Sequence, residues 1–112
     1  MIYKICDEAS WAAAREEGLL HGSAADARDG FIHFSTAAQL AETAAKHFAG
    51  MADLVLLAID ADALGPALKW EPSRGGDLFP HLYAGLPLSA VRWARPIASD
   101  AQGRHVIPEL PR

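Results

Sequence analysis

Two short apolar segments of the chain each carry one histidine and end in hydroxyl-bearing residues. They are Gly30–Thr36 (GFIHFST), which contains His33, and Phe79–Tyr83 (FPHLY), which contains His81. A buried imidazole costs free energy unless its ring nitrogens have polar partners, and histidine is the side chain best suited to exchange protons near neutral pH. We therefore predict that both histidines face one polar cleft, where they bind a ligand or act as catalytic acid and base.

The neighbours of these histidines have both a functional and a structural interpretation. Side chains two residues apart share one face of a strand, which groups His33 with Ser35 and His81 with Tyr83. Ser35 would position polar groups of the ligand, and Tyr83 would stack on it or donate its hydroxyl. Thr36 is a further ligand-binding candidate, although helix capping alone explains it. Buried, hydrogen-bonded histidines that serve only the fold are the structural alternative.

Glu71 is a third candidate for catalysis, because it ends an apolar strand next to Pro72 and a glycine-rich turn. From there its carboxylate could reach the cleft, or it could pair with Arg74 on the surface. A metal site is not expected. The five histidines include no pair at i, i+2 or i, i+4, and the chain has no C-x-x-C motif.

The overall composition limits the classes of partner. Ten lysines and arginines against fourteen aspartates and glutamates give a formal net charge of −4, and the cations are scattered. Nucleic-acid backbones and anionic membranes both require clustered positive charge, so neither is an expected partner. The single cysteine, Cys6, lies in an apolar run and is predicted to be buried. Without a disulfide, a leader-like segment or an apolar stretch of about 20 residues, the protein is predicted to be cytoplasmic.

The pattern of apolar residues predicts a single domain of the α+β class over residues 1–112. Strands outnumber helices and do not alternate with them regularly, which argues against a doubly wound parallel sheet. The predicted strands are Ile2–Cys6, Phe31–Ser35, Leu54–Ile59, Ala67–Glu71, Leu78–Tyr83 and Ala90–Ile97.

Two main helices are predicted between these strands. The first covers Glu8–Glu17 and is capped by Asp7, and the second covers about 36–48, where Thr36 and Gln39 match a capping box. Residues 20–30 show no helical or strand period and are predicted to form a loop, and residues 98–112 are predicted to be a polar surface tail.

Taken in chain order, these motifs resemble those of a known family of short bacterial proteins, the domain of unknown function numbered 952. The resemblance covers about Met1 to Ile107. Besides the two histidine segments it rests on Ile2–Ile5 (IYKI), Gln39, Leu54–Leu57 (LVLL), Trp70 with Glu71, Gly85 and Pro87. Members of that family resemble the ADP-ribosyltransferase fold. The resemblance therefore implies two small, mostly antiparallel sheets that, with the two helices, frame a cleft for NAD.

The resemblance also implies roles for single residues. In active transferases of that fold a first-strand histidine holds the NAD ribose, and Lys4 occupies the position where relatives often have that histidine. An aromatic residue stacks on the nicotinamide, and a glutamate supports the oxocarbenium-like transition state. Glu71 is the glutamate near a plausible site strand, and Lys4 is a ligand-binding candidate.

The leading hypothesis is therefore a small cleft protein that binds a nucleotide-like or NAD-related small molecule, with group transfer as an associated activity. His33 and His81 would carry the chemistry. The alternative is a non-catalytic interaction or regulatory module with structural histidines. A third hypothesis is hydrolytic or transferase chemistry by Lys4 beside His33.

Overall fold

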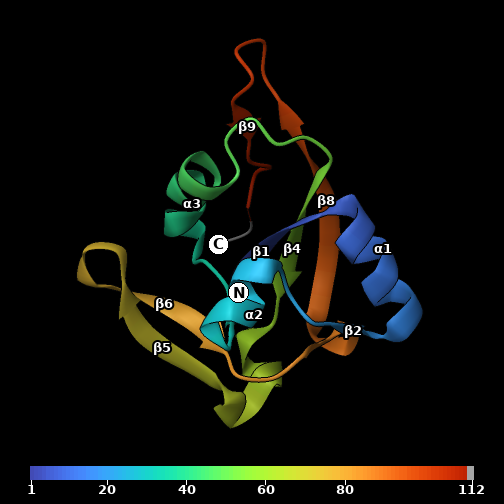
Figure 1. The fold of residues 1–112 in the computed structure, drawn as a ribbon, viewed down its shortest axis with the longest axis vertical. Coiled ribbons are helices and arrows are strands. Elements are labelled where there is room, and N and C mark those ends of the chain that lie inside the picture. Colours follow the sequence, from blue (N-terminus) through green and yellow to red (C-terminus); the bar gives the residue numbers. More distant parts are fainter. Residues whose placement is uncertain (111–112) are drawn as a thin grey trace.

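A four-stranded antiparallel sheet forms the centre of the protein. The computed structural model describes residues 1–110, apart from the side chain of Arg74. In sheet order the strands are β1 (Ile2–Asp7), β4 (Leu54–Ile59), β8 (Val91–Ser99) and β9 (His105–Val106). Because β1 and β8 both pair with β4 along its whole length, β4 is the central strand (Figure 1).

The sequence of β4 explains its central position. Every residue of the strand is buried, and Leu56, Leu57 and Ile59 are fully enclosed. Successive side chains point to opposite faces, where Leu57 joins the hydrophobic cluster of Ile2 and Leu56 joins that of Tyr3. A continuous apolar run is what a strand covered on both faces requires, and the strand predicted here is confirmed.

Two helices cover the opposite faces of this sheet. α1 (Glu8–Glu17) begins after Asp7, whose carboxylate accepts the backbone N–H of Ser10 at 2.6 Å, and ends at Gly18. α3 (Leu40–His47) follows the 3-10 turn η1 (Ala37–Gln39). Ala14 of α1 packs in the cluster of Ile2, and Leu40 of α3 packs in the cluster of Tyr3. Both predicted main helices are confirmed.

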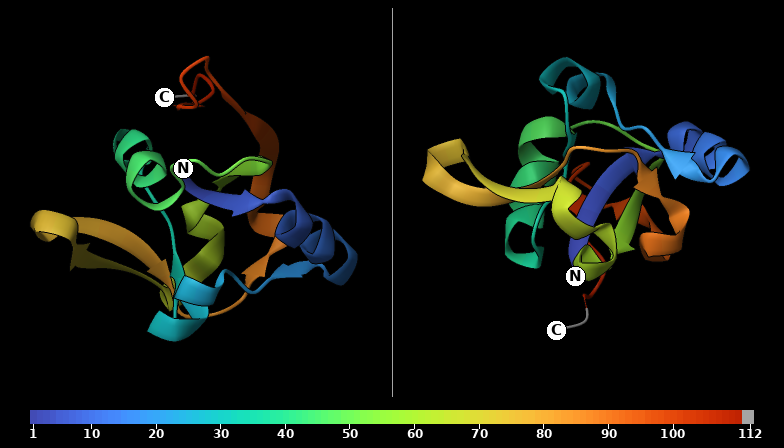
Figure 2. Two further views of the ribbon diagram at one scale, coloured as in Figure 1. Left: turned by 45° about the horizontal axis from the view of Figure 1, so that its top comes forward. Right: turned by 90° about the horizontal axis from the view of Figure 1, so that it is seen from below.

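A second antiparallel sheet lies beside the first. Its order is β3 (Ile32–His33), β6 (Asp77–Leu82) and β5 (Leu68–Ser73). β5 and β6 form a hairpin that projects from the body on the side away from α1, as all views show, with η3 (Arg74–Gly76) at its tip (Figures 1 and 2). The two sheets meet where Tyr3 and Ser35 exchange backbone hydrogen bonds of 2.8 and 2.9 Å. The predicted α+β class with antiparallel sheets is confirmed.

Shorter elements connect the two sheets. β2 (Leu19–Leu20) pairs with β7 (Leu86–Pro87), and the 3-10 turns η2 (Ala61–Ala67) and η4 (Leu88–Ala90) precede β5 and β8. The segment predicted as a tail from residue 98 begins inside β8 and returns as β9, and Ile107 and Leu110 pack partly on the core. Residues 111–112 lie outside the described part.

The prediction of a loop over residues 20–30 is wrong. This segment contains helix α2 (Ala24–Asp29), which begins with a capping box between Ser23 and Asp26 and ends at Gly30, whose φ is 84°. A helix this short does not complete a recognisable apolar period, so its caps are its sequence signal. Ser23 and Asp26 match the spacing of a capping box, with aspartate in place of the usual glutamate or glutamine.

We expect Leu56→Ala to lower the free energy of unfolding by about 2–5 kcal/mol, because it leaves a cavity in a packed core. Leu56 is completely buried, whereas Leu78 on the projecting hairpin is 53% exposed. Leu78→Ala is the matched control, with an expected change within about 0.5 kcal/mol. Urea unfolding measures both changes. Equal losses in the two variants would contradict the central position of β4.

Candidate functional site

The pairing of β3 with β6 places the two histidines of the predicted site opposite each other. His33 is the register partner of His81, and their ring centroids are 5.4 Å apart. Phe31 stacks on His81 at 4.1 Å and contacts His33 at 4.7 Å, and its centroid is 5.2 Å from that of Tyr83. These four residues form one aromatic cluster. The structure thus brings His33, His81 and Tyr83 together, while their roles toward a ligand stay a prediction.

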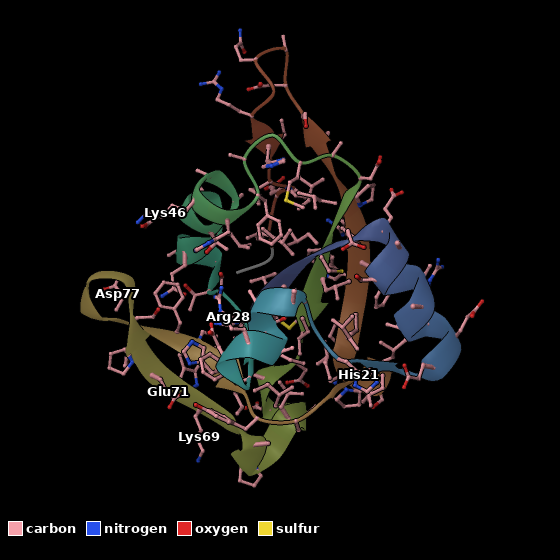
Figure 3. All side chains as sticks on the ribbon, viewed as in Figure 1. His21, Arg28, Lys46, Lys69, Glu71 and Asp77 are labelled. Atoms are coloured by element: carbon pink, nitrogen blue, oxygen red, sulfur yellow. The ribbon has the colours of Figure 1, made fainter. Side chains whose placement is uncertain are left out.

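Glu71 on β5 connects two members of the aromatic cluster. Its Oε1 lies 2.9 Å from Nδ1 of His81 and accepts the hydroxyl of Tyr83 at 2.7 Å. Two hydrogen bonds lower the pKa of Glu71: the one from Tyr83 has the larger effect and the one from His81 the smaller. The hydrogen bond between Tyr83 and Glu71 also raises the pKa of Tyr83. Figure 3 shows Glu71 on the projecting hairpin. The alternative partner, Arg74, has its side chain outside the described part.

His33 is held by two aspartates of α2 that sequence reasoning missed. Oδ1 of Asp26 lies 2.5 Å from Nδ1 of His33 and accepts the backbone N–H of His33 at 3.1 Å. On the other side of the ring, Nε2 lies 2.9 Å from Oδ2 of Asp29. The capping box at Ser23 was the one signal that could have pointed to Asp26. The His33 ring therefore lies between two carboxylates, one buried and one partly exposed.

Lys4 reaches this site from β1 through a buried ion pair. Its ammonium lies 2.8 Å from Oδ2 of Asp26, and the two residues are only 7% and 3% exposed. Burial alone would raise the pKa of Asp26, but the hydrogen bond from His33 and the charge of Lys4 outweigh burial and hold this pKa well below its usual range. Asp26 is therefore ionised at neutral pH, and Lys4 neutralises it.

A pocket of about 260 Å³ opens beside the aromatic cluster. Phe31 and Tyr83 line it together with Asp26 and His21, the last of which is labelled in Figure 3. The volume is slightly below the range of about 300–1,000 Å³ that is usual for small-molecule sites. A larger hollow of about 550 Å³, between α3 and the turn from β8 to β9, is lined mainly by small side chains and contains none of the predicted site residues.

Ser35 and Thr36 are not part of the pocket lining. Ser35 is 3% exposed, and its hydroxyl is hydrogen-bonded to that of Thr43 on α3 at 2.8 Å. Thr36 precedes η1, and its backbone N–H donates to the side chain of Gln39 at 3.0 Å, as expected for a capping box. In this structure both residues contribute to the junction between β3 and α3.

The structure also bears on metal, membrane and cysteine sites. Among the described residues, no group of three or more His, Cys, Asp or Glu side chains could hold a metal ion. In the same part of the chain, no helix is long and apolar enough to cross a membrane. Cys6 is buried, and burial raises the pKa of its thiol to about 11. Because the thiolate is the reactive form, Cys6 is a core residue rather than a nucleophile.

The fold and site define a small mixed α/β domain in which a curled antiparallel sheet carries a cluster of aromatic and ionisable residues. Residues 5–94 match the family described as "Protein of unknown function (DUF952)". The chain belongs to this family, which confirms the family resemblance predicted from its motifs.

The protein is also similar to solved structures of protein CC0527 from Caulobacter crescentus. With a crystal structure it shares 52% identity over 94% of this chain and 92% of that chain, with a TM-score of 0.90. The solution NMR structure of CC0527 gives 53% identity, 92% and 89% coverage and a TM-score of 0.82. The comparison with curated proteins found no match.

We expect Asp26→Asn to lower the free energy of unfolding by about 3–5 kcal/mol, because it leaves the buried ammonium of Lys4 without a counter-charge. The control is Asp29→Asn, which removes the partly exposed carboxylate that contacts the His33 ring. It should lower the free energy of unfolding much less. Urea unfolding at pH 7 measures both. Similar losses would show that Asp26 does not compensate a buried charge.

The lowered pKa of Asp26 also predicts a dependence of stability on pH. A carboxyl group with a folded pKa below its unfolded value of about 3.9 stabilises the fold fully above about pH 5. That contribution disappears as the pH falls through the unfolded value toward the folded one. The difference in free energy of unfolding between the wild type and Asp26→Asn should therefore shrink from pH 5 toward pH ~2. Parallel pH profiles for the two proteins would contradict this.

Proposed function

We propose that the pocket beside the aromatic cluster binds a small planar ligand of the nucleotide-like class. The observation that carries this proposal is that a pocket lined by two aromatic rings lies next to histidines held by carboxylates. Phe31 and Tyr83 line it. His33 and His81 are not among its lining residues, but both contact Phe31. Pockets that combine apolar walls with a few convergent polar groups are the usual sites for small molecules.

Each residue has a definite part in this proposal. Tyr83 is 44% exposed and Phe31 is half-buried, so their rings are available to stack on a base or a nicotinamide. Stacking of one base on an aromatic side chain contributes about 1–3 kcal/mol. The His33 side chain is 37% exposed and contacts Phe31, so we propose that it reaches a ligand bound in the pocket that Phe31 lines. His81, Glu71 and Lys4 would act from the surrounding layer, because His81 and Lys4 are buried.

NAD is the first ligand to test. We infer that the two small antiparallel sheets of this protein follow the arrangement of ADP-ribosyltransferases, in which such sheets frame an NAD cleft. Glu71 is hydrogen-bonded to His81 and Tyr83, and we propose it as the carboxylate that assists group transfer. A histidine in contact with carboxylates could serve as the acid or base in such a step.

A second candidate function is a non-catalytic interaction or regulatory module. The observation that favours it is the burial of His81, which is 5% exposed and has Nδ1 hydrogen-bonded to Glu71. On this interpretation the aromatic cluster stabilises the hairpin of β5 and β6, and the exposed face of that hairpin is the functional surface. Trp70 and Leu78 lie there, 47% and 53% exposed.

Thermal unfolding with and without NAD, ADP-ribose and common nucleotides tests the proposed function. A ligand at 100 times its dissociation constant stabilises the fold by about 2.7 kcal/mol, which raises the melting temperature by roughly 10 °C in a domain of this size. His33→Ala should abolish that shift. His47→Ala is the control, because His47 is exposed on α3 and no residue of α3 lines the pocket.

The outcomes separate the two functions. A shift with one of these ligands that His33→Ala removes and His47→Ala retains would support the pocket. No shift with any of them would favour the interaction module. A shift that survives His33→Ala would place the ligand elsewhere, and the larger hollow beside α3 would be the next site to test.

A further inference from the structure

We propose that Asp26 is a positioning residue for His33. Asp26 holds the His33 ring at Nδ1, so that Nε2 is presented to the ligand. This inference rests on the proposed function, in which His33 meets the ligand. Asp26 itself borders the pocket, but protein donors occupy both of its oxygens. It therefore acts through His33 rather than on the ligand directly.

The contacts of Asp26 fix both the backbone and the ring of His33. One oxygen, Oδ1, accepts the backbone N–H of His33 and lies 2.5 Å from Nδ1 of the same residue. The other, Oδ2, accepts the ammonium of Lys4 and the backbone N–H of Ser23, each at 2.8 Å. The nitrogen that carries the proton in a histidine is set by the hydrogen bond that the other nitrogen makes. Contact with Asp26 therefore keeps a proton on Nδ1.

The backbone of Gly22 packs closely against the carboxylate of Asp26. Gly22 passes so close that a Cβ there would lie 2.5 Å from Oδ2 of Asp26. A buried ion pair contributes little net stability compared with a well-packed apolar pair, so stability alone does not explain Lys4 and Asp26. The positioning of His33 requires an ionised acceptor beside Nδ1. The Lys4–Asp26 ion pair supplies one, whereas an apolar pair would not.

The partly exposed contact of His33 is the one that a ligand can replace. The side chain of Asp29 is 33% exposed, and its Oδ2 faces Nε2. A histidine ring donates from both nitrogens only when it carries both protons. If such a ring transfers one proton to a ligand, Nδ1 keeps its proton for Asp26 and Nε2 gives up its own. Nε2 then becomes an acceptor and can take a proton back.

The test is the tautomer of His33 in ¹⁵N-labelled protein, read from the ring nitrogens by long-range proton–nitrogen NMR at pH ~9, well above the ordinary histidine range. We expect a single form with the proton on Nδ1. Lys4→Met combined with Asp26→Leu replaces the ion pair by apolar side chains and leaves no unpaired buried charge. It also removes the acceptor of the Ser23 and His33 backbone N–H groups, so some loss of stability is expected. In this variant the Nδ1–H form should be lost, and affinity for a ligand found by thermal unfolding should fall at least tenfold.

Asp29→Asn is the control for the other nitrogen, and it should leave the Nδ1–H form unchanged. A wild-type ring with its proton on Nε2, or an Nδ1–H form that survives in the double variant, would overturn the proposal. The wild-type spectrum alone decides the first point, even if the double variant does not fold. Because this readout needs no ligand, failure of ligand binding with the expected tautomer would remove the proposed function and leave the positioning role intact.

Discussion

The buried contact between Lys4 and Asp26 joins the parts of the molecule that make up the site. Lys4 belongs to β1 of the central sheet, and Asp26 belongs to α2, which leads directly into β3 of the second sheet. An unpaired charge in this position would be strongly destabilising. The pair therefore forces β1, α2 and β3 into one arrangement. His33 is bound to the same carboxylate, so the geometry of the candidate site follows from how the two sheets are joined.

The second sheet carries the site because it is small and open. A two-stranded hairpin has little core of its own, and β5 and β6 are anchored at the body mainly by β3 and the aromatic cluster. Cross-strand pairing sets His33 against His81, and Glu71 on the neighbouring strand β5 is hydrogen-bonded to His81 through its side chain. Stacking of Phe31 on His81 thus fixes the base of the hairpin and one wall of the pocket together.

Much of this arrangement follows from local sequence patterns. The apolar run of β4, the capping residues of α1 and the alternation around His33 and His81 are short-range signals, and the structure agrees with each. The partners of the histidines are not local. Asp26 is seven residues from His33 and lies in a helix of six residues, and Glu71 is ten residues from His81 across a hairpin. Such contacts depend on how elements pack, which neither composition nor period encodes. The partner of Ser35 is likewise not local: its place in a strand suggested a ligand contact, which stays a prediction, and its hydroxyl is hydrogen-bonded to Thr43 on α3.

The position of β5 at the outer edge of its sheet has a consequence for self-association. An edge strand offers unpaired backbone groups to any other extended chain, and natural proteins blunt such edges with proline or charge. β5 contains Pro72, which has no N–H to donate, and Lys69, which carries a charge. These residues discourage a second molecule from extending the sheet, so the hairpin can expose Trp70 to solvent without becoming a template for aggregation.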